Sequence, residues 1–236
     1  MTIIFGGTTE GREAAAALRD AGEDVLVCVM SSYARSLLPG TMLCHVGALD
    51  ASQMKALLLE RQPSRVVDAT HPYAVQVTQQ LHAVCEELGI RYERIERPVS
   101  DGGWRDAVEW AEDAEEAAEA LWRTDGPILL TTGSKTLPAY AARIPAERLW
   151  VRVLPTMAAL EICSAAGIPA SHIIAMQGPF TEPLNAALYD MLGIRTVVTK
   201  DSGHAGGADE KILPALARGI HVIVIRRPAE KERESL

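Results

Sequence analysis

The residues best suited to chemistry lie in short polar segments that each follow an apolar run. The first comes at the start of the chain, where Thr2-Ile3-Ile4-Phe5 is followed by Gly6-Gly7-Thr8-Thr9-Glu10-Gly11 and a predicted helix from Arg12 to Ala21. Glycines let a backbone approach a ligand closely, and a helix N-terminus offers free N–H groups and a positive dipole end. We therefore expect these six residues and Arg12 to hold a phosphate group. The spacing differs from G-x-G-x-x-G, so a plain tight turn is the alternative.

The densest polar segment covers residues 197–211. Lys200, Asp201, Ser202 and His204 stand in a loop that also contains Gly203, Gly206 and Gly207. Asp209 is expected to cap the next helix, with Lys211 in its first turn. Two lysines near one glycine-rich turn favour a functional loop over one that only bridges space.

Polar residues also follow the second predicted strand, Val25–Val29. An NAD-binding fingerprint places a carboxylate here, whereas this chain has Ser31, Ser32 and Arg35. Hydroxyls and an arginine suit a 2′-phosphate, so NADP fits better than NAD. The alternative is that one of the serines only caps the next helix.

Asp68-Ala69-Thr70-His71-Pro72 follows the fourth predicted strand. Ligands in open α/β sheets bind beyond the carboxyl ends of the strands, which favours ligand contact for His71. Pro72 suits the first turn of a helix, with Thr70 or His71 as its cap. Asp68 is better explained as a structural acceptor for backbone N–H groups.

Two similar segments lie in the second half of the chain. Thr131-Thr132-Gly133-Ser134-Lys135 follows an apolar strand but lacks the length and spacing of a Walker A loop. A lysine at a helix start faces an unfavourable dipole, so Lys135 points to an anionic partner. Gln177, in the segment 175–180, also comes directly after a predicted strand.

Composition narrows the class of protein. The chain has 236 residues, of which 48% are hydrophobic and 5% aromatic, and a net charge of −8, which argues against a nucleic-acid binder. Residues 97–127 hold 3 basic and 9 acidic side chains, whereas residues 128–236 hold 12 and 10, so the second half can receive an anionic ligand. The four cysteines form no C-x-x-C pair, and no histidine stands at metal-ligand spacing.

The N-terminus enters a strand directly and no apolar run is long enough for a bilayer, so we expect a cytoplasmic protein without membrane contact.

Apolar runs alternate with helical patterns along nearly the whole chain, which predicts βαβ units and parallel sheets. We expect an α/β fold of two Rossmann-like, open, mainly parallel sheets that face each other across a cleft. The domains would be residues 1–97 and 104–236, joined by a linker at 98–103 with proline and paired glycines. Strands are expected near 3–5, 25–29, 42–46, 65–69, 91–95, 128–130, 149–153, 172–175, 196–198 and 221–225. Helices are expected near 12–21, 33–38, 50–61, 74–88, 113–122, 136–143, 156–166, 182–192 and 209–218.

Taken together, these segments resemble the precorrin-6A reductase family of corrin biosynthesis. The resemblance rests on I-I-F-G-G-T-T-E-G-R, V-V-D-A-T-H-P-Y-A, L-L-T-T-G-S-K, I-I-A-M-Q-G-P-F, V-T-K-D-S-G-H-A-G-G-A-D-E-K and the final R-R-P, in this order along the chain.

The resemblance implies a reductase that moves hydride from a nicotinamide cofactor, NADPH or else NADH, to a double bond of precorrin-6A or of its cobalt form. It implies cofactor contacts from the first glycine turn, from Ser31, Ser32, Arg35 and Thr70, and from Gly133, Ser134 and Lys135. The anionic tetrapyrrole would be bound by Arg152, Gln177, Asp201, Ser202, Gly203 and Lys211. Lys200 and His71 are the expected proton donors, and any cobalt belongs to the substrate, not to a protein metal site.

Two other functions compete with this one. A non-catalytic NADP-binding sensor would share the first glycine turn but would not need the lysines at 200 and 211. A short-chain reductase or epimerase needs a Tyr-x-x-x-Lys pair, and no tyrosine here has a lysine four residues later. The resemblance also leaves room for transient contact with neighbouring enzymes of the pathway.

Overall fold

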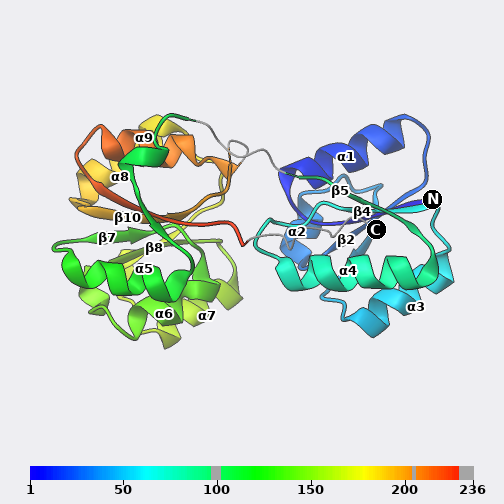
Figure 1. Cartoon of the computed structure of the whole chain (residues 1–236), viewed down its shortest axis with the longest axis horizontal. Coiled ribbons are helices and arrows are strands. Elements are labelled where there is room, and N and C mark those ends of the chain that lie inside the picture. Colours follow the sequence, from blue (N-terminus) through cyan, green and yellow to red (C-terminus); the bar gives the residue numbers. More distant parts are fainter. Residues whose placement is uncertain (97–101, 204–205, 229–236) are drawn as a thin grey trace. The chain divides into compact units, whose positions relative to one another are not determined.

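The computed structural model describes residues 1–96, 102–203 and 206–228 (Figure 1). Residues 98–101 of the expected linker, and His204, lie outside the described residues. The described chain divides into two compact units, one within Met1–Glu96 and one within Arg97–Pro228. Each unit contains one sheet in which all paired strands are parallel.

The first unit is a five-stranded sheet in the order β3-β2-β1-β4-β5. Its strands are β1 (Thr2–Phe5), β2 (Val25–Val29), β3 (Leu43–Val46), β4 (Arg65–Asp68) and β5 (Arg91–Arg94). Its helices are α1 (Thr9–Asp20), α2 (Ser32–Ser36), α3 (Ala51–Arg61) and α4 (Val75–Leu88). The chain proceeds outward from β1 to β3 and then returns beside β1 as β4. The topological switch point, where open sheets bind ligands, therefore lies between β1 and β4.

Both faces of this sheet are covered, with α1 on one face and α3 and α4 on the other (Figure 1). Successive strand residues point to opposite faces, so Ile3 and Phe5 pack in the cluster that contains Met54 of α3, whereas Ile4 packs with Ala15 of α1. Burial on both sides explains why β1 and β2 are apolar at nearly every position.

The second unit is a six-stranded sheet in the order β6-β11-β10-β7-β8-β9. Its strands are β6 (Glu109–Ala111), β7 (Ile128–Leu130), β8 (Leu149–Val153), β9 (Ile173–Ala175), β10 (Thr196–Lys200) and β11 (His221–Ile225). Its helices are α5 (Ala114–Ala120), α6 (Leu137–Ala141), α7 (Met157–Ala165), α8 (Glu182–Leu192) and α9 (Asp209–Leu216), with short 3-10 turns at η1 (Arg105–Ala107), η2 (Leu121–Arg123), η3 (Ser134–Thr136), η4 (Ala146–Arg148) and η5 (Ala170–His172). The chain leaves β7 toward β9 and returns beside β7 as β10, so this switch point lies between β7 and β10.

Helices α8 and α9 cover one face of the second sheet, and α5, α6 and α7 lie on the other (Figure 1). Leu129 and Val197 of the central strands pack against Tyr189 of α8 and Ile212 of α9. Trp104, which precedes the first strand of this unit, belongs to the same cluster.

The predicted α/β class with parallel sheets is confirmed, and every predicted strand is present within two residues of its expected ends. The predicted starts of two helices are wrong, and one strand was missed. Helix α1 begins at Thr9, three residues earlier than predicted, because the side chain of Thr8 caps it. Strand β6 was not predicted, since three residues with one charge carry almost no pattern. Pro72 lies outside α4, which begins at Val75 without a side-chain cap.

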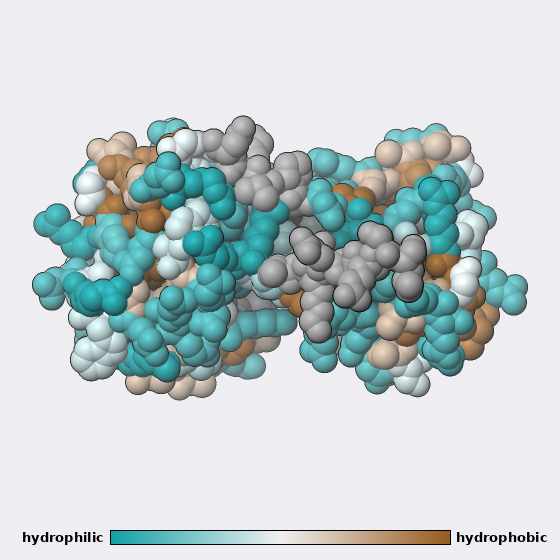
Figure 2. Space-filling model, viewed as in Figure 1, coloured by the Kyte–Doolittle hydropathy of each residue, from teal (hydrophilic) through white to brown (hydrophobic). Residues whose placement is uncertain are grey.

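The surface in Figure 2 is mainly hydrophilic, with hydrophobic residues scattered between. Among the described residues, no helix combines the length and the apolar character that crossing a membrane requires. The described cysteines are all free, and Cys28, Cys85 and Cys163 are buried.

Candidate functional site

The glycine turn after β1 packs directly on the loop after β4. Gly6 has a φ of +147°, and a Cβ at this position would lie 2.2 Å from the carbonyl oxygen of Ala69. The hydroxyl of Thr8 donates to this same oxygen at 2.9 Å, and a Cβ on Gly11 would lie 3.0 Å from Cβ of Ala69. Gly6 and Gly11 are therefore required by the close approach of the two loops at the switch point.

The same turn can bind an anion. The backbone N–H groups of Gly7, Thr8 and Thr9 have no acceptor among the described residues, and they precede or open the 12-residue helix α1. Arg12 donates to the carbonyl oxygen of Gly7 at 2.9 Å and to Oγ1 of Thr9 at 3.1 Å, and within the described chain it has no carboxylate partner. A phosphate would receive N–H groups, the positive end of a dipole and a nearby cation. Glu10 stands in the same first turn.

A buried ion pair supports the loop after β4. Asp68 is fully buried and accepts from the N–H of Thr70 at 2.9 Å, from the hydroxyl of Tyr92 at 2.8 Å and from the guanidinium of Arg94 at 2.6 Å. Arg94 also donates to Thr78 of α4. Burial alone would raise the pKa of Asp68, but the hydrogen bonds from Thr70 and Tyr92 and the charge of Arg94 hold that pKa below its ordinary value. The structural role predicted for Asp68 is confirmed.

His71 and Thr70 follow this ion pair. His71 is exposed, and its Nδ1 accepts from the N–H of Tyr73 at 3.3 Å. The hydroxyl of Thr70 lies 3.2 Å from that of Thr78. One of these two residues was expected to cap α4, but neither does, because a turn at 71–74 separates them from the helix. The ligand contacts predicted for both stay predictions.

The segment after β2 is occupied mainly by its own local contacts. The side chain of Ser31 caps α2 by accepting from the N–H of Ala34 at 3.2 Å. The guanidinium of Arg35 donates to carbonyl oxygens of the loop after α2, at Leu38, Pro39 and Gly40. Ser31, Ser32 and Arg35 were predicted to bind the 2′-phosphate of the cofactor. To do so, Ser31 and Arg35 would have to give up these local contacts, whereas Ser32 is the first residue of α2.

In the second unit, the switch point gathers two lysines. Thr131, directly after β7, donates from both its N–H and its hydroxyl to the carbonyl oxygen of Val198 in β10. Lys135 is exposed in η3, and Lys200 is half-buried at the last position of β10. The pKa of Lys200 is lowered, first by burial and second by the positive charge of Lys135. An anionic ligand at this edge of the sheet would be attracted by both ammonium groups.

The described residues at the start of the loop after β10 are buried. Asp201 and Ser202 are both nearly inaccessible, and Gly203 has a φ of +67°. Asp201 pairs with Arg105 at 3.3 Å, and Lys211 donates to Oγ of Ser202 at 3.3 Å. Direct substrate contact by Asp201, Ser202, Gly203 and Lys211 stays a prediction. The expected cap at Asp209 is wrong, because Asp209 is the first helical residue and its carboxylate accepts from the indole N–H of Trp104.

Arg152 and Gln177 differ in exposure. Arg152 of β8 is 6% exposed, donates to Oδ1 of Asn185 at 2.6 Å, and lies over the ring of Phe180 at 4.1 Å. Burial lowers its pKa to about 10. Gln177 is exposed just beyond β9. The structure gives Arg152 a packing role that its sequence position did not reveal, and a substrate contact for either residue stays a prediction.

Sequence reasoning missed two groups that support these loops. Tyr92 and Arg94 of β5 hold Asp68, and Trp104 and Arg105 contact the loop after β10. The only local sign of these roles in the sequence was the presence of Tyr92 and Arg94 on a short strand, and of Trp104 directly after two glycines.

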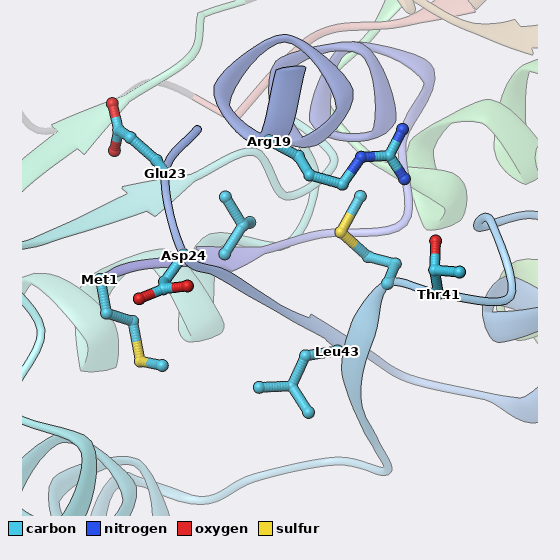
Figure 3. A pocket seen from close by; sticks show the side chains of 8 residues that line it. Met1, Arg19, Glu23, Asp24, Thr41 and Leu43 are labelled. Carbon is cyan, nitrogen blue, oxygen red and sulfur yellow. The ribbon is translucent and has the colours of Figure 1, made fainter. Parts of the chain in front are cut away.

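A pocket of about 220 Å³ lies elsewhere, at the amino ends of the strands of the first sheet (Figure 3). It is lined by Met1, Arg19, Glu23, Asp24, Val25, Thr41, Met42 and Leu43. Because open α/β sheets bind ligands at the carboxyl ends, this pocket is not the candidate site. Within the described part of the chain, no three His, Cys, Asp or Glu side chains are grouped to hold a metal ion.

Two parallel sheets, each with polar loops at its switch point, define a two-unit α/β protein of the Rossmann class. A family model described as "Precorrin-6x reductase CbiJ/CobK" matches residues 2–236. The chain belongs to this family. The predicted resemblance is confirmed, and the family places the chain as an oxidoreductase at a reduction step of cobalamin biosynthesis.

Curated relatives agree over nearly the whole length. "Cobalt-precorrin-6A reductase" of Priestia megaterium is 35% identical over 232 residues, covering 97% of this chain and 91% of the relative. The protein of the same name from Salmonella typhimurium is 35% identical over 230 residues, with 96% and 87% covered. "Precorrin-6A reductase" of Rhodococcus erythropolis is 31% identical over 229 residues, with 96% and 88% covered. A solved structure titled "CobK precorrin-6A reductase" has a TM-score of 0.78 at 24% identity, covering 98% of this chain and 90% of that one, which supports the fold.

Proposed function

We propose that this chain reduces a carbon–carbon double bond of precorrin-6A, or of its cobalt form, with hydride from NADPH. The glycine turn after β1 binds the pyrophosphate through its free N–H groups and Arg12. Lys135 contacts the cofactor, Lys211 binds a carboxylate of the tetrapyrrole, and Lys200 delivers a proton. The Priestia and Salmonella relatives, both named for the cobalt form, are 35% identical and the Rhodococcus protein is 31% identical, so the cobalt form is the first substrate to assay.

The observation that carries the proposal is the lysine pair at the switch point of the second sheet. Burial and the charge of Lys135 both lower the pKa of Lys200. Two close cations favour an anionic ligand, and a lysine with a lowered pKa releases its proton more readily than an ordinary one. Lys200 therefore suits proton delivery to the carbon next to the one that receives hydride. His71, exposed on the loop after β4, is the second candidate donor.

NADPH supplies the hydride when bound, and the protein supplies orientation and charge. The glycine turn fits such a cofactor because its three N–H groups lack acceptors in the described chain, while Arg12 contacts the same turn at Gly7 and Thr9. The 2′-phosphate is expected beside Ser31 and Ser32, which makes NADPH the preferred form.

The test begins with fluorescence titration of the purified protein with NADPH and with NADH, followed by turnover with each form of the substrate. We expect tighter binding of NADPH, and a loss of kcat of about 100-fold or more in Lys200→Met with unchanged affinity for NADPH. Lys55→Met is the control, because Lys55 forms an exposed ion pair with Glu87 on the first unit. Full activity of Lys200→Met would remove Lys200 from the reaction. Cofactor binding without any turnover by the wild-type chain would favour the non-catalytic sensor.

A further inference from the structure

Two consecutive residues contact the two ends of the loop that joins β10 to α9. The indole N–H of Trp104 donates to Oδ1 of Asp209 at 2.6 Å, and the guanidinium of Arg105 donates to Oδ2 of Asp201 at 3.3 Å. Asp201 directly follows β10, and Asp209 is the first residue of α9. The described ends of this loop are therefore held from one short segment that lies about a hundred residues earlier in the chain.

The Trp104 contact is built into the core. Trp104 is 1% exposed and packs in the cluster with Ala208 and Ile212. A Cβ on Gly102 would lie 2.6 Å from Oδ1 of Asp209 and 2.8 Å from Nε1 of Trp104. Glycine at position 102 thus leaves the room that this hydrogen bond requires.

The Arg105 contact is also supported on several sides. The guanidinium carbon of Arg105 lies 4.5 Å from the centre of the Trp110 ring, and the indole N–H of Trp110 donates to the carbonyl oxygen of Arg105 at 3.0 Å. The backbone of Asp201 is fixed as well, since its N–H donates to Ile225 and its carbonyl oxygen accepts from Arg227, both at 2.9 Å. Asp201 is therefore held at its backbone by two hydrogen bonds and at Oδ2 of its buried carboxylate by Arg105.

The residues held in this way are neighbours of the functional lysines. Lys200 directly precedes Asp201, and Lys211 lies two residues beyond Asp209. Lys211 donates to Ser202, which links the two sides of the loop. A small shift of either end would move an ammonium group relative to a substrate carboxylate, and misplacement of this kind is costly for catalysis.

We propose that Trp104 and Arg105 are positioning residues, which hold Asp209 and Asp201. They thereby set where Lys211 meets a carboxylate of the substrate and where Lys200 meets the carbon that it protonates. This inference rests on the proposed function, which gives those lysines their role. The competing explanation is that both residues serve only core packing.

Hydrogen–deuterium exchange tests the holding role without any ligand. Trp104→Phe keeps an aromatic ring in the core but loses the N–H, and Arg105→Gln loses the charge. We expect amide exchange at 201–202 to rise about fivefold in Arg105→Gln, and at 210–212 by a similar factor in Trp104→Phe. Controls are Trp150→Phe, a tryptophan of the same unit that stacks on His172, and Arg123→Gln, an exposed arginine paired with Glu109. Exchange equal to that of the controls would overturn the inference.

Steady-state kinetics then test the consequence. We expect the KM for the tetrapyrrole to rise about tenfold in both variants while the Kd for NADPH stays at the wild-type value, and Arg105→Lys to recover part of the loss. A KM equal to the wild-type value, or a parallel loss of NADPH affinity, would overturn the positioning role. If the wild-type chain reduces no precorrin, the proposed function fails, and the exchange experiment still decides whether these two residues hold the loop.

Discussion

The turn after β1 and the loop after β10 each lie at the carboxyl end of a strand beside the switch point of its sheet. They are built from different contacts. The first turn is fixed by backbone approach, because Gly6 and Gly11 lie against Ala69. The second is fixed by charged and aromatic side chains, because Arg105 and Trp104 hold its ends. We therefore expect the turn after β1 to be most sensitive to side-chain atoms added at its glycines. The loop after β10 should be most sensitive to the loss of its polar contacts.

The sharpest test of the backbone approach is Gly6→Ala. Its Cβ would overlap the carbonyl oxygen of Ala69 and its φ of +147° is strained for alanine. We expect a loss of about 3 kcal/mol or more in the free energy of unfolding, measured by urea titration. Gly47→Ala is the matched control, since Gly47 has a φ of +134° but its Cβ would meet nothing closer than 3.9 Å. Equal losses in the two variants would show that backbone strain, not close approach, requires the glycine.

The next test concerns the ion pair beneath the loop that the glycines contact. Asp68→Asn leaves Arg94 without its buried carboxylate, which should cost about 3 kcal/mol at neutral pH. Because the pKa of Asp68 is lowered in the folded protein, its charged form stabilises the fold above the unfolded pKa, about 3.9. The contribution is lost as the pH falls through the lowered folded pKa. We therefore expect the difference in the free energy of unfolding between the wild type and Asp68→Asn to shrink as the pH is lowered, as measured by unfolding along a pH series.

Asp24→Asn serves as the control for this pH series, because it removes an exposed carboxylate from the same unit. A wild-type advantage over Asp68→Asn that stays constant down to strongly acidic pH would contradict the assigned role of the Asp68 charge.

Cofactor titration separates two arginines of the first unit. Arg12 donates to the carbonyl oxygen of Gly7 in the glycine turn, so Arg12→Ala should raise the Kd for NADPH and NADH alike, by about 10- to 100-fold. Arg35 is engaged with three carbonyl oxygens, so Arg35→Ala should raise the Kd for NADPH less than about tenfold and leave NADH unaffected. A large, NADPH-specific loss in Arg35→Ala would instead show that its guanidinium leaves those oxygens for the 2′-phosphate.

The smallest expected effect is a shift in pH dependence at the second loop. The charge of Lys135 helps to lower the pKa of Lys200, so Lys135→Met should raise that pKa toward the ordinary value of a lysine. If the protonated Lys200 is the proton donor, the alkaline limb of kcat/KM moves to higher pH in this variant. Lys55→Met should leave the limb in place, and an unmoved limb in Lys135→Met would separate Lys200 from the proton transfer.

Prediction from the sequence succeeded where local pattern decides structure. Buried parallel strands are near-continuous apolar runs, so Val25–Val29 and His221–Ile225 were predicted with their observed ends. Asp113 caps α5 through the N–H of Glu116, as its position before a Glu-rich turn indicated. Prediction failed where two signals compete, as at Thr9–Gly11, where a glycine-rich segment predicted a turn but the cap of Thr8 starts the helix.

The sequence by itself determined the alternating α/β order, the polar loops at the strand ends and the family, since these depend on residues close together in the chain. Only the tertiary structure decided which loops meet. Ala69 lies against Gly6, and Asp209 accepts from Trp104, because parallel strands bring together segments that are tens to a hundred residues apart. Periodicity reports which face of an element is buried, but the partner across that face depends on strand order, which no local pattern encodes.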